Sequence, residues 1–169
     1  MAAQDIYSIT YLPPISWVSS FLKSENPVID IYEHYIKQTY RNRTDIYSPN
    51  GKQTLSIPVI KKYHHTKVKD IEISNVEPWS SIHWKAIRAA YNNSPFFIYY
   101  EDELSPVFHK THSSLLTFVK ELLETIFELI GIEKELIFSD HYIEKDDLNR
   151  DFRNFFNQKN NTVSVPKYI

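Results

Sequence analysis

The segment from Ser113 to Ile130 carries apolar residues at the spacing of an α-helix, and it constrains the fold of this 169-residue chain more than any other stretch. Its apolar positions are Leu115, Phe118, Val119, Leu122, Leu123, Ile126, Phe127 and Ile130, which share one helical face. Gly131 follows directly, as is typical of a helix end. Because such a face must be covered by other elements, the segment predicts a globular protein with one hydrophobic core.

Shorter segments on both sides predict strands and further helices. Strands are predicted over 6–11, 28–32, 68–73 and 136–139, helices over 16–23, 80–93 and 94–104, and a hairpin joins 40–48 to 53–59 across Asn50-Gly51. Ser16 is the predicted cap of the first helix. This order indicates an α/β protein, with α+β as the alternative. We expect a three-layer single domain over 1–143, with a central mixed sheet, a β-hairpin insertion and flanking helices, followed by a polar C-terminal extension over 144–169.

Composition excludes several classes of site. The chain has no cysteine, so thiolate nucleophiles, thiolate metal sites and disulfides are excluded. Gly51 and Gly131 are its only glycines, which excludes a P-loop or a Rossmann glycine fingerprint. A net charge of −2 argues against nucleic acid as a partner. No signal peptide is recognisable, and charges interrupt the longest apolar region, so we expect a cytoplasmic protein without membrane insertion.

The segment from Glu33 to Arg43 alternates more charged with less charged positions. If it is extended, successive side chains point to opposite faces, and one face then carries Glu33, Tyr35, Lys37, Arg41 and Arg43. Two arginines two residues apart can present two planar donor forks to one anion, and Lys37 adds a point charge. This row predicts a site for a phosphate or a carboxylate.

A scaffold role is the alternative interpretation of the same row. Arg41 and Arg43 would then pair with internal carboxylates, and the candidates are Asp30, Glu33 and Asp45. Glu33 and Lys37 would form a local ion pair if the segment were helical. The sequence leaves the ligand site and the scaffold both open.

The predicted helix over 80–93 supplies a second group of candidates. His83 is a candidate general base because an imidazole titrates near neutral pH, and a hydrogen-bonded packing residue is the alternative. Trp84 and Tyr91 can stack on a sugar or a base, or they can fill the core. The adjacent histidines His64 and His65 lack the spacing of a helical metal pair, and no metal site is predicted.

Several motifs together resemble the WbqC-like protein family, in particular its Bacteroidetes-type branch. They are Tyr11-Leu12-Pro13-Pro14, the block from Lys37 to Arg43, Asn50-Gly51 with Leu55 to Val59, His83-Trp84-Lys85 through Ala90-Tyr91, Ser94 to Phe97, and Tyr100 to Leu104. Asp151-Phe152-Arg153 resembles a further family pattern, Asp-aromatic-Arg, although many longer relatives continue beyond the equivalent of Tyr168. The resemblance implies a bacterial protein of surface polysaccharide or O-antigen biosynthesis.

Two functions follow from this resemblance and from the predicted anion site. The first is a transferase that binds a nucleotide sugar or another phosphorylated intermediate and transfers an acyl or aminoacyl group. The second is a non-catalytic protein of the same pathway that binds an anionic metabolite or a partner. The predicted substrate-binding residues are Lys37, Gln38, Tyr40, Arg41, Asn42, Arg43, Trp84 and Tyr91, and the predicted catalytic residues are Glu33 and His83. The sequence assigns no cofactor.

Overall fold

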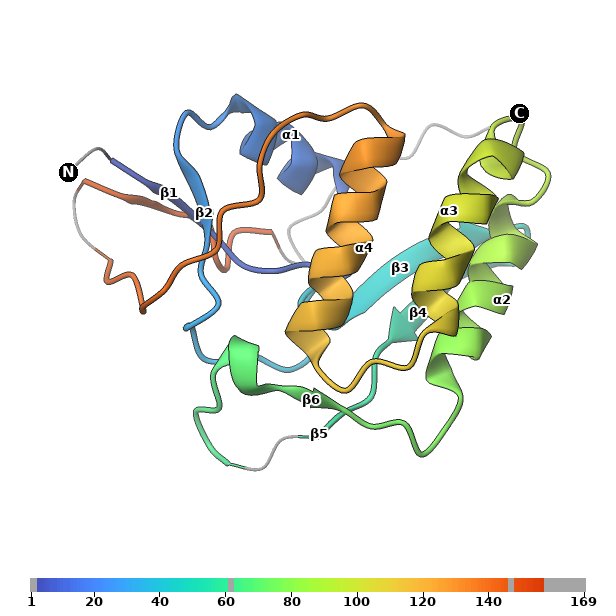
Figure 1. Cartoon of the computed structure of the whole chain (residues 1–169), viewed down its shortest axis with the longest axis horizontal. Helices are drawn as coiled ribbons and strands as arrows, with labels where there is room; N and C mark the ends of the chain where they lie inside the picture. Colours follow the sequence, from blue (N-terminus) through green and yellow to red (C-terminus); the bar gives the residue numbers. More distant parts are fainter. Residues whose placement is uncertain (1–2, 61–62, 146–147, 157–169) are drawn as a thin grey trace.

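The computed structural model describes residues 3–60, 63–145 and 148–156 (Figure 1). Its elements are β1 (Asp5–Tyr7), α1 (Ile15–Lys23), β2 (Pro27–Ile29), β3 (Arg43–Ser48), β4 (Gly51–Ser56), β5 (Val59–Ile60), the 3-10 helix η1 (Val68–Asp70), β6 (Glu72–Ile73), α2 (Trp79–Tyr91), α3 (Phe97–His109), α4 (Leu115–Leu129) and β7 (Arg150–Asp151). The predicted α/β class is confirmed by this mixture of helices and parallel strands.

The strands lie in three groups rather than in one mixed sheet. β1 is the middle strand of a parallel sheet, between β2 and β7. The antiparallel pairs β3–β4 and β5–β6 are separate from it. The strand predicted over 136–139 appears as a single parallel bridge from Phe138 to Ile29 in β2. Alternating patterns predict strands well, but the choice of partner depends on distant segments that no local pattern contains.

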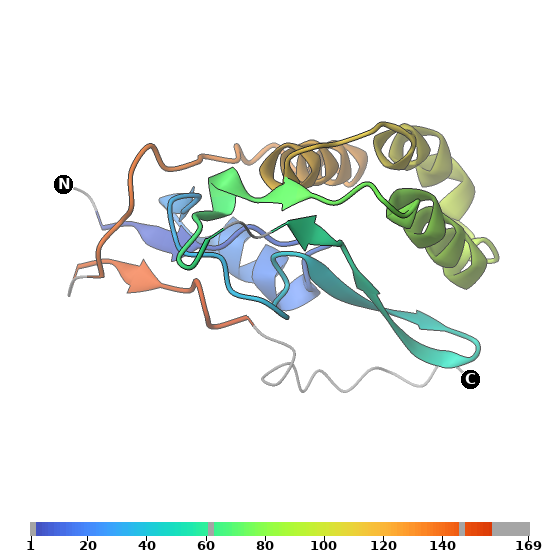
Figure 2. The same ribbon diagram turned by 90° about the horizontal axis from the view of Figure 1, so that it is seen from below.

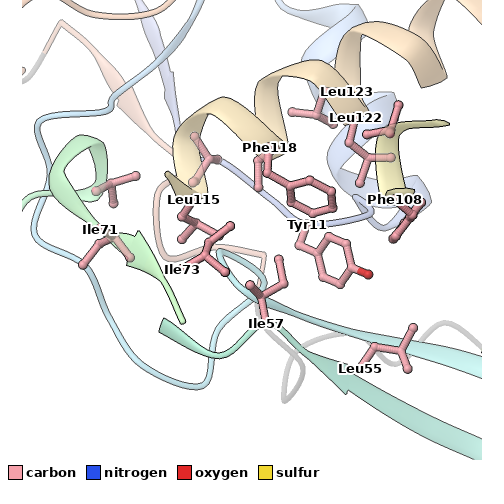
Figure 3. Close-up of a cluster of buried hydrophobic side chains, with 14 of the residues drawn as sticks. Tyr11, Leu55, Ile57, Ile71, Ile73, Phe108, Leu115, Phe118, Leu122 and Leu123 are labelled. Carbon is pink, nitrogen blue, oxygen red and sulfur yellow. The ribbon is translucent and has the colours of Figure 1, made fainter. Parts of the chain in front are cut away.

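Helix α4 covers the core with the apolar face that its sequence predicts. Ser114 caps it by accepting a hydrogen bond from the Thr117 N–H at 3.4 Å, and Gly131 closes it with a φ of 69°, a conformation that favours glycine. Figure 3 shows Leu115 and Phe118 of α4 among the buried side chains of the neighbouring strands. The helices α2, α3 and α4 lie side by side as one layer, and the hairpin β3–β4 extends beneath α2 and α3 (Figure 2).

Helix α1 begins one residue before the predicted cap. Its N-cap is Pro14 rather than Ser16, and no described side chain caps this end. Trp17 and Phe21 hold α1 against the sheet, since their rings lie 5.6 Å and 5.3 Å from the ring of Tyr7 in β1. The Pro14 side chain therefore satisfies none of the first backbone N–H groups of α1.

The segment 33–43 is not the extended strand that the alternating pattern required. Residues 37–42 form turns, and Gln38 has a φ of 59°. Within this segment His34 pairs in an isolated bridge with Lys67, and Arg43 is already the first residue of β3. Because the chain turns at Gln38, Arg41 and Arg43 do not continue the row begun by Glu33 and Tyr35.

The C-terminal residues 150–156 take part in the fold, although they belong to the segment predicted to be a polar extension. Arg150 and Asp151 form β7 alongside β1, and Phe152 and Phe156 stack on Tyr7. The rest of the predicted extension, from residue 157 onward, lies outside the described residues. In the described part of the chain, no helix has the length and apolar character needed to cross a membrane.

Candidate functional site

A cavity of about 540 Å³ lies between the start of α1, the hairpin strand β3 and helices α2 and α3, and we call it the α1 cavity. Its lining is mostly apolar and aromatic. It consists of Leu12, Pro13, Pro14, Ile15, Ser16, Tyr40, Thr44, Asp45, Ile46, Tyr47, Lys52, Trp84, Ile87, Tyr91, Leu104 and Phe108. A cavity of this size with a few polar groups has the character of a small-molecule site.

Aromatic rings form the walls of the α1 cavity. Trp84 is held by stacking on Phe97 and Phe108, at centroid distances of 6.1 Å and 5.5 Å. The Tyr91 hydroxyl accepts a hydrogen bond from the Tyr47 N–H at 3.3 Å, which joins α2 to the hairpin. Such fixed rings can stack on the apolar face of a sugar or on a base. The structure thus brings together three residues of the predicted substrate-binding set, namely Tyr40, Trp84 and Tyr91.

The polar groups of the α1 cavity come from the hairpin and from the N-terminus of α1. Lys52 Nζ lies 3.2 Å from Asp45 Oδ2, and Asp45 Oδ1 accepts a hydrogen bond from the Thr54 hydroxyl at 2.6 Å. Ile15 and Ser16, the first residues of α1, also line the cavity. The N-terminus of a helix carries a partial positive charge and favours anions. An anionic group in the cavity would therefore meet both this helix end and Lys52.

Arg41 and Glu33 lie outside the α1 cavity, in a buried cluster at the carboxyl end of the parallel strands. Arg41 Nε donates to Glu33 Oε1 at 2.8 Å, and Nη2 donates to Glu33 Oε2 at 2.6 Å. Arg41 also donates to the Ser8 hydroxyl at 2.7 Å and to the Arg153 carbonyl at 3.2 Å. Burial is the largest influence on the Glu33 carboxyl and raises its pKa, while the guanidinium of Arg41 acts in the opposite direction.

A second ion pair completes this cluster. Arg153 Nη1 donates to Asp30 Oδ2 at 2.7 Å, and the Asp30 side chain is fully buried. Ser139 donates to the other Asp30 oxygen at 3.1 Å. Asp151 receives two further hydrogen bonds from the Arg153 side chain. The carboxyl ends of β1, β2 and β7 are thus joined by two arginines, Arg41 and Arg153, that bind three carboxylates.

The remaining residues of the predicted anion site are dispersed. Lys37 and Gln38 are exposed in the turn. Asn42 is buried and donates from Nδ2 to the Ile57 carbonyl at 2.9 Å. Arg43 is half-buried and does not line the α1 cavity, and its buried Nε has no partner among the described residues.

His83 also stands apart from the cavity. Its Nδ1 lies 3.0 Å from the Tyr11 hydroxyl, and Trp79 packs edge-on against its ring. Burial lowers the pKa of His83 to about 4, so its imidazole is neutral at neutral pH. This environment is that of a hydrogen-bonded packing residue, which was one of the two interpretations of the sequence.

The sequence interpretation did not single out Asp45, Lys52 or the start of α1 as site residues. A signal for the helix end was present, because Pro13-Pro14 precedes an apolar helix and proline cannot cap with its side chain. Asp45 and Lys52 carried no such signal, because they line the cavity only through the packing of the hairpin against α1 and α2. Within the described ranges, no three histidine or acidic side chains are grouped as metal ligands.

Comparison with known proteins identifies the family to which the sequence is similar. The model of the WbqC-like protein family matches residues 9–164. The uncharacterized protein Rv1507c of Mycobacterium tuberculosis (strain ATCC 25618 / H37Rv) is 28% identical over 130 residues, which are 75% of this chain and 52% of that protein. The chain thus spans about half the length of this curated relative. No solved structure matches it.

Proposed function

The chain belongs to the WbqC-like protein family, as its motifs predicted, and from this premise we propose that it binds a phosphorylated sugar, such as a nucleotide sugar, in polysaccharide-related biosynthesis. The observation that carries this proposal is the composition of the α1 cavity. Its aromatic walls suit a sugar ring or a base, and its two positive features, Lys52 and the start of α1, suit a phosphate.

More specifically, we propose that the protein is a transferase that moves an acyl or aminoacyl group to or from the sugar. Asp45 is the one carboxylate among the described residues that line the α1 cavity. In this reaction a hydroxyl or amine attacks the acyl carbonyl, the new bond forms as the leaving group departs with its electron pair, and Asp45 accepts the proton of the attacking group. Glu33 and His83 do not line this cavity, so Asp45 takes the role predicted for them.

A non-catalytic binding protein of the same pathway is the second candidate function. It is favoured by the position of Glu33 and His83 outside the cavity, which leaves few titratable groups near a bound ligand. Both functions share the binding site and differ only in the role of Asp45.

A thermal-shift screen against UDP, UDP-glucose and glucose 1-phosphate tests the binding site. A ligand of the folded state raises the melting temperature, and Lys52→Ala should reduce that rise. Lys120→Ala is the matched control, because Lys120 is also an exposed lysine in an ion pair, 3.8 Å from Glu124, but lies on α4. No shift with any of the compounds, or an equal loss in both variants, would refute the proposed site.

A transfer assay with Asp45→Asn separates the two candidate functions. Asparagine keeps the size of the side chain but cannot accept a proton, so the transferase predicts normal binding with activity lowered at least about a hundredfold. Asp70→Asn is the control, because Asp70 is ion-paired with Lys69 at 3.6 Å away from the cavity. Binding without any detectable transfer by the wild-type protein would support the non-catalytic function.

A further inference from the structure

A second, smaller cavity lies at the carboxyl end of β1, and we call it the edge cavity. Its volume of about 10 Å³ is that of a single water-sized group. It is lined by Ser8, Ile9, Thr10, Trp17, Tyr40, Arg41, Phe152, Arg153 and Phe156. In open α/β sheets, ligands bind beyond the carboxyl ends of the parallel strands, so the position itself is a common place for a ligand group.

Two buried polar atoms at the edge cavity have no partner among the described residues. They are the Thr10 hydroxyl oxygen and the Trp17 indole nitrogen, whose residues are 2% and 1% exposed. A buried polar group without a hydrogen-bond partner destabilises the folded state. Both residues line the cavity, so a small occupant there lies against both and can supply the missing hydrogen-bond partner.

The lining defines the chemistry of this occupant. The Trp17 indole can only donate, so the occupant must accept a hydrogen bond, while the Thr10 hydroxyl can donate or accept. The charge of Arg41 is already offset by Glu33, and Ser8 already donates to the Arg153 carbonyl at 2.7 Å. A neutral oxygen, as in water or an alcohol, fits this environment, whereas a phosphate is too large and finds no free positive charge.

The edge cavity adjoins the α1 cavity. Tyr40 lines both, and the consecutive residues Ser16 and Trp17 of α1 line one each. We propose that the edge cavity is the hydroxyl-binding subsite of the α1 cavity: it holds one water molecule in the free protein, and a sugar hydroxyl that passes Tyr40 displaces this water. This subsite rests on the proposed function, since it assumes that the ligand of the α1 cavity contains a sugar.

NMR of the Trp17 indole N–H tests the subsite directly. The chain has three tryptophans, and Trp17→Phe assigns the signal. In the free protein we expect a cross-peak from this N–H to a bound water. Saturation with UDP-glucose should remove the cross-peak, whereas saturation with UDP, which lacks the sugar, should leave it. Absence of the water cross-peak in the free protein, or its persistence with UDP-glucose bound, would overturn the proposal.

Removal of the Thr10 hydroxyl supplies the second measurement. Thr10→Val should weaken the binding of UDP-glucose about fivefold to tenfold and leave the affinity for UDP unchanged, because one neutral hydrogen bond is lost. Thr125→Val is the control, since the Thr125 hydroxyl is bonded to the Glu121 carbonyl within α4 at 2.8 Å. Equal affinity of the Thr10 variant and the wild type for UDP-glucose would contradict the subsite.

These measurements distinguish an error in the proposed phosphorylated ligand from an error in the proposed hydroxyl subsite. If UDP and UDP-glucose both fail to bind, the phosphorylated ligand is refuted, and free glucose at high concentration then tests the subsite. Loss of the water cross-peak with glucose supports the subsite without the phosphate. Its persistence with glucose refutes the subsite as well.

Discussion

Arg41 and Glu33 form a buried ion pair in which two nitrogens of the guanidinium bind the two oxygens of the carboxylate, at 2.8 Å and 2.6 Å. Their side chains are only 3% and 6% exposed. The pair closes the turn that contains Gln38 and presents Tyr40 to both cavities. A pair that is this well bonded neutralises its own charge, so Arg41 contributes to the shape of the site rather than to its net charge.

Breaking this pair should destabilise the protein strongly. Arg41→Met leaves the Glu33 carboxylate buried without its partner, and we expect the free energy of unfolding to fall by about 3–5 kcal/mol. The double variant Glu33→Leu with Arg41→Met removes both charges and should recover a large part of this loss. Urea denaturation of the two variants checks the prediction. A double variant less stable than Arg41→Met would show that the pair contributes more than charge compensation.

Removal of the Arg153 side chain should lower the free energy of unfolding more than removal of the Arg150 side chain, although the two residues lie three positions apart. Arg153→Ala leaves Asp30 as an uncompensated charge in the core and should cost about 3–5 kcal/mol of unfolding free energy. Arg150 also binds a carboxylate, that of Asp5, but its own side chain is 68% exposed. The Asp5 carboxylate is itself only 7% exposed, but it also accepts a hydrogen bond from the Ser24 hydroxyl, and removal of the exposed Arg150 side chain opens it to water. Arg150→Ala should therefore cause a smaller loss. Similar midpoints of urea denaturation for the two variants would contradict the buried role of Arg153.

His83 should make the stability of the protein depend on pH between about 4 and 6.5. Burial lowers its folded pKa to about 4, whereas the unfolded side chain titrates near 6.5, so the unfolded state binds more protons in this range. Stability should therefore fall by up to about 3 kcal/mol as the pH drops through this range. His83→Asn should flatten this dependence, measured by urea denaturation across the range. His109→Asn, at the exposed end of α3, should leave it unchanged.

Gln38 occupies a backbone conformation that glycine adopts more easily. It is exposed with a φ of 59°, so Gln38→Gly should raise the free energy of unfolding by about 0.5–1 kcal/mol by relieving this strain. Gln53→Gly is the same change in the exposed part of β4 and should lower it by about 0.5–1 kcal/mol. Thermal unfolding of both variants measures the difference. Stabilisation by neither change would contradict the strain at Gln38.

The sequence predicted those residues of the candidate site whose own side-chain type and spacing along one helix mark them. Trp84 and Tyr91 were recognisable as aromatic side chains on one helix, and both reach the α1 cavity. The proposed row from Glu33 to Arg43 depended on an extended backbone, which the turn at Gln38 removes. Asp45 and Lys52 come together within the predicted hairpin, but their place in the α1 cavity depends on how the hairpin packs against α1 and α2, which the hairpin sequence does not reveal.

By itself, the sequence determined the α/β class, the helix α4 with its apolar face and glycine end, the hairpin at Asn50-Gly51, and the family. These features depend on interactions between residues close together in the chain, so composition and spacing are enough to predict them. The tertiary structure alone decided that Arg41 pairs with Glu33, that Arg153 reaches Asp30, and that the α1 cavity lies beside the edge cavity. The first depends on the turn at Gln38, which the alternating pattern did not reveal, and the other two depend on contacts between distant segments, for which the sequence has no local pattern.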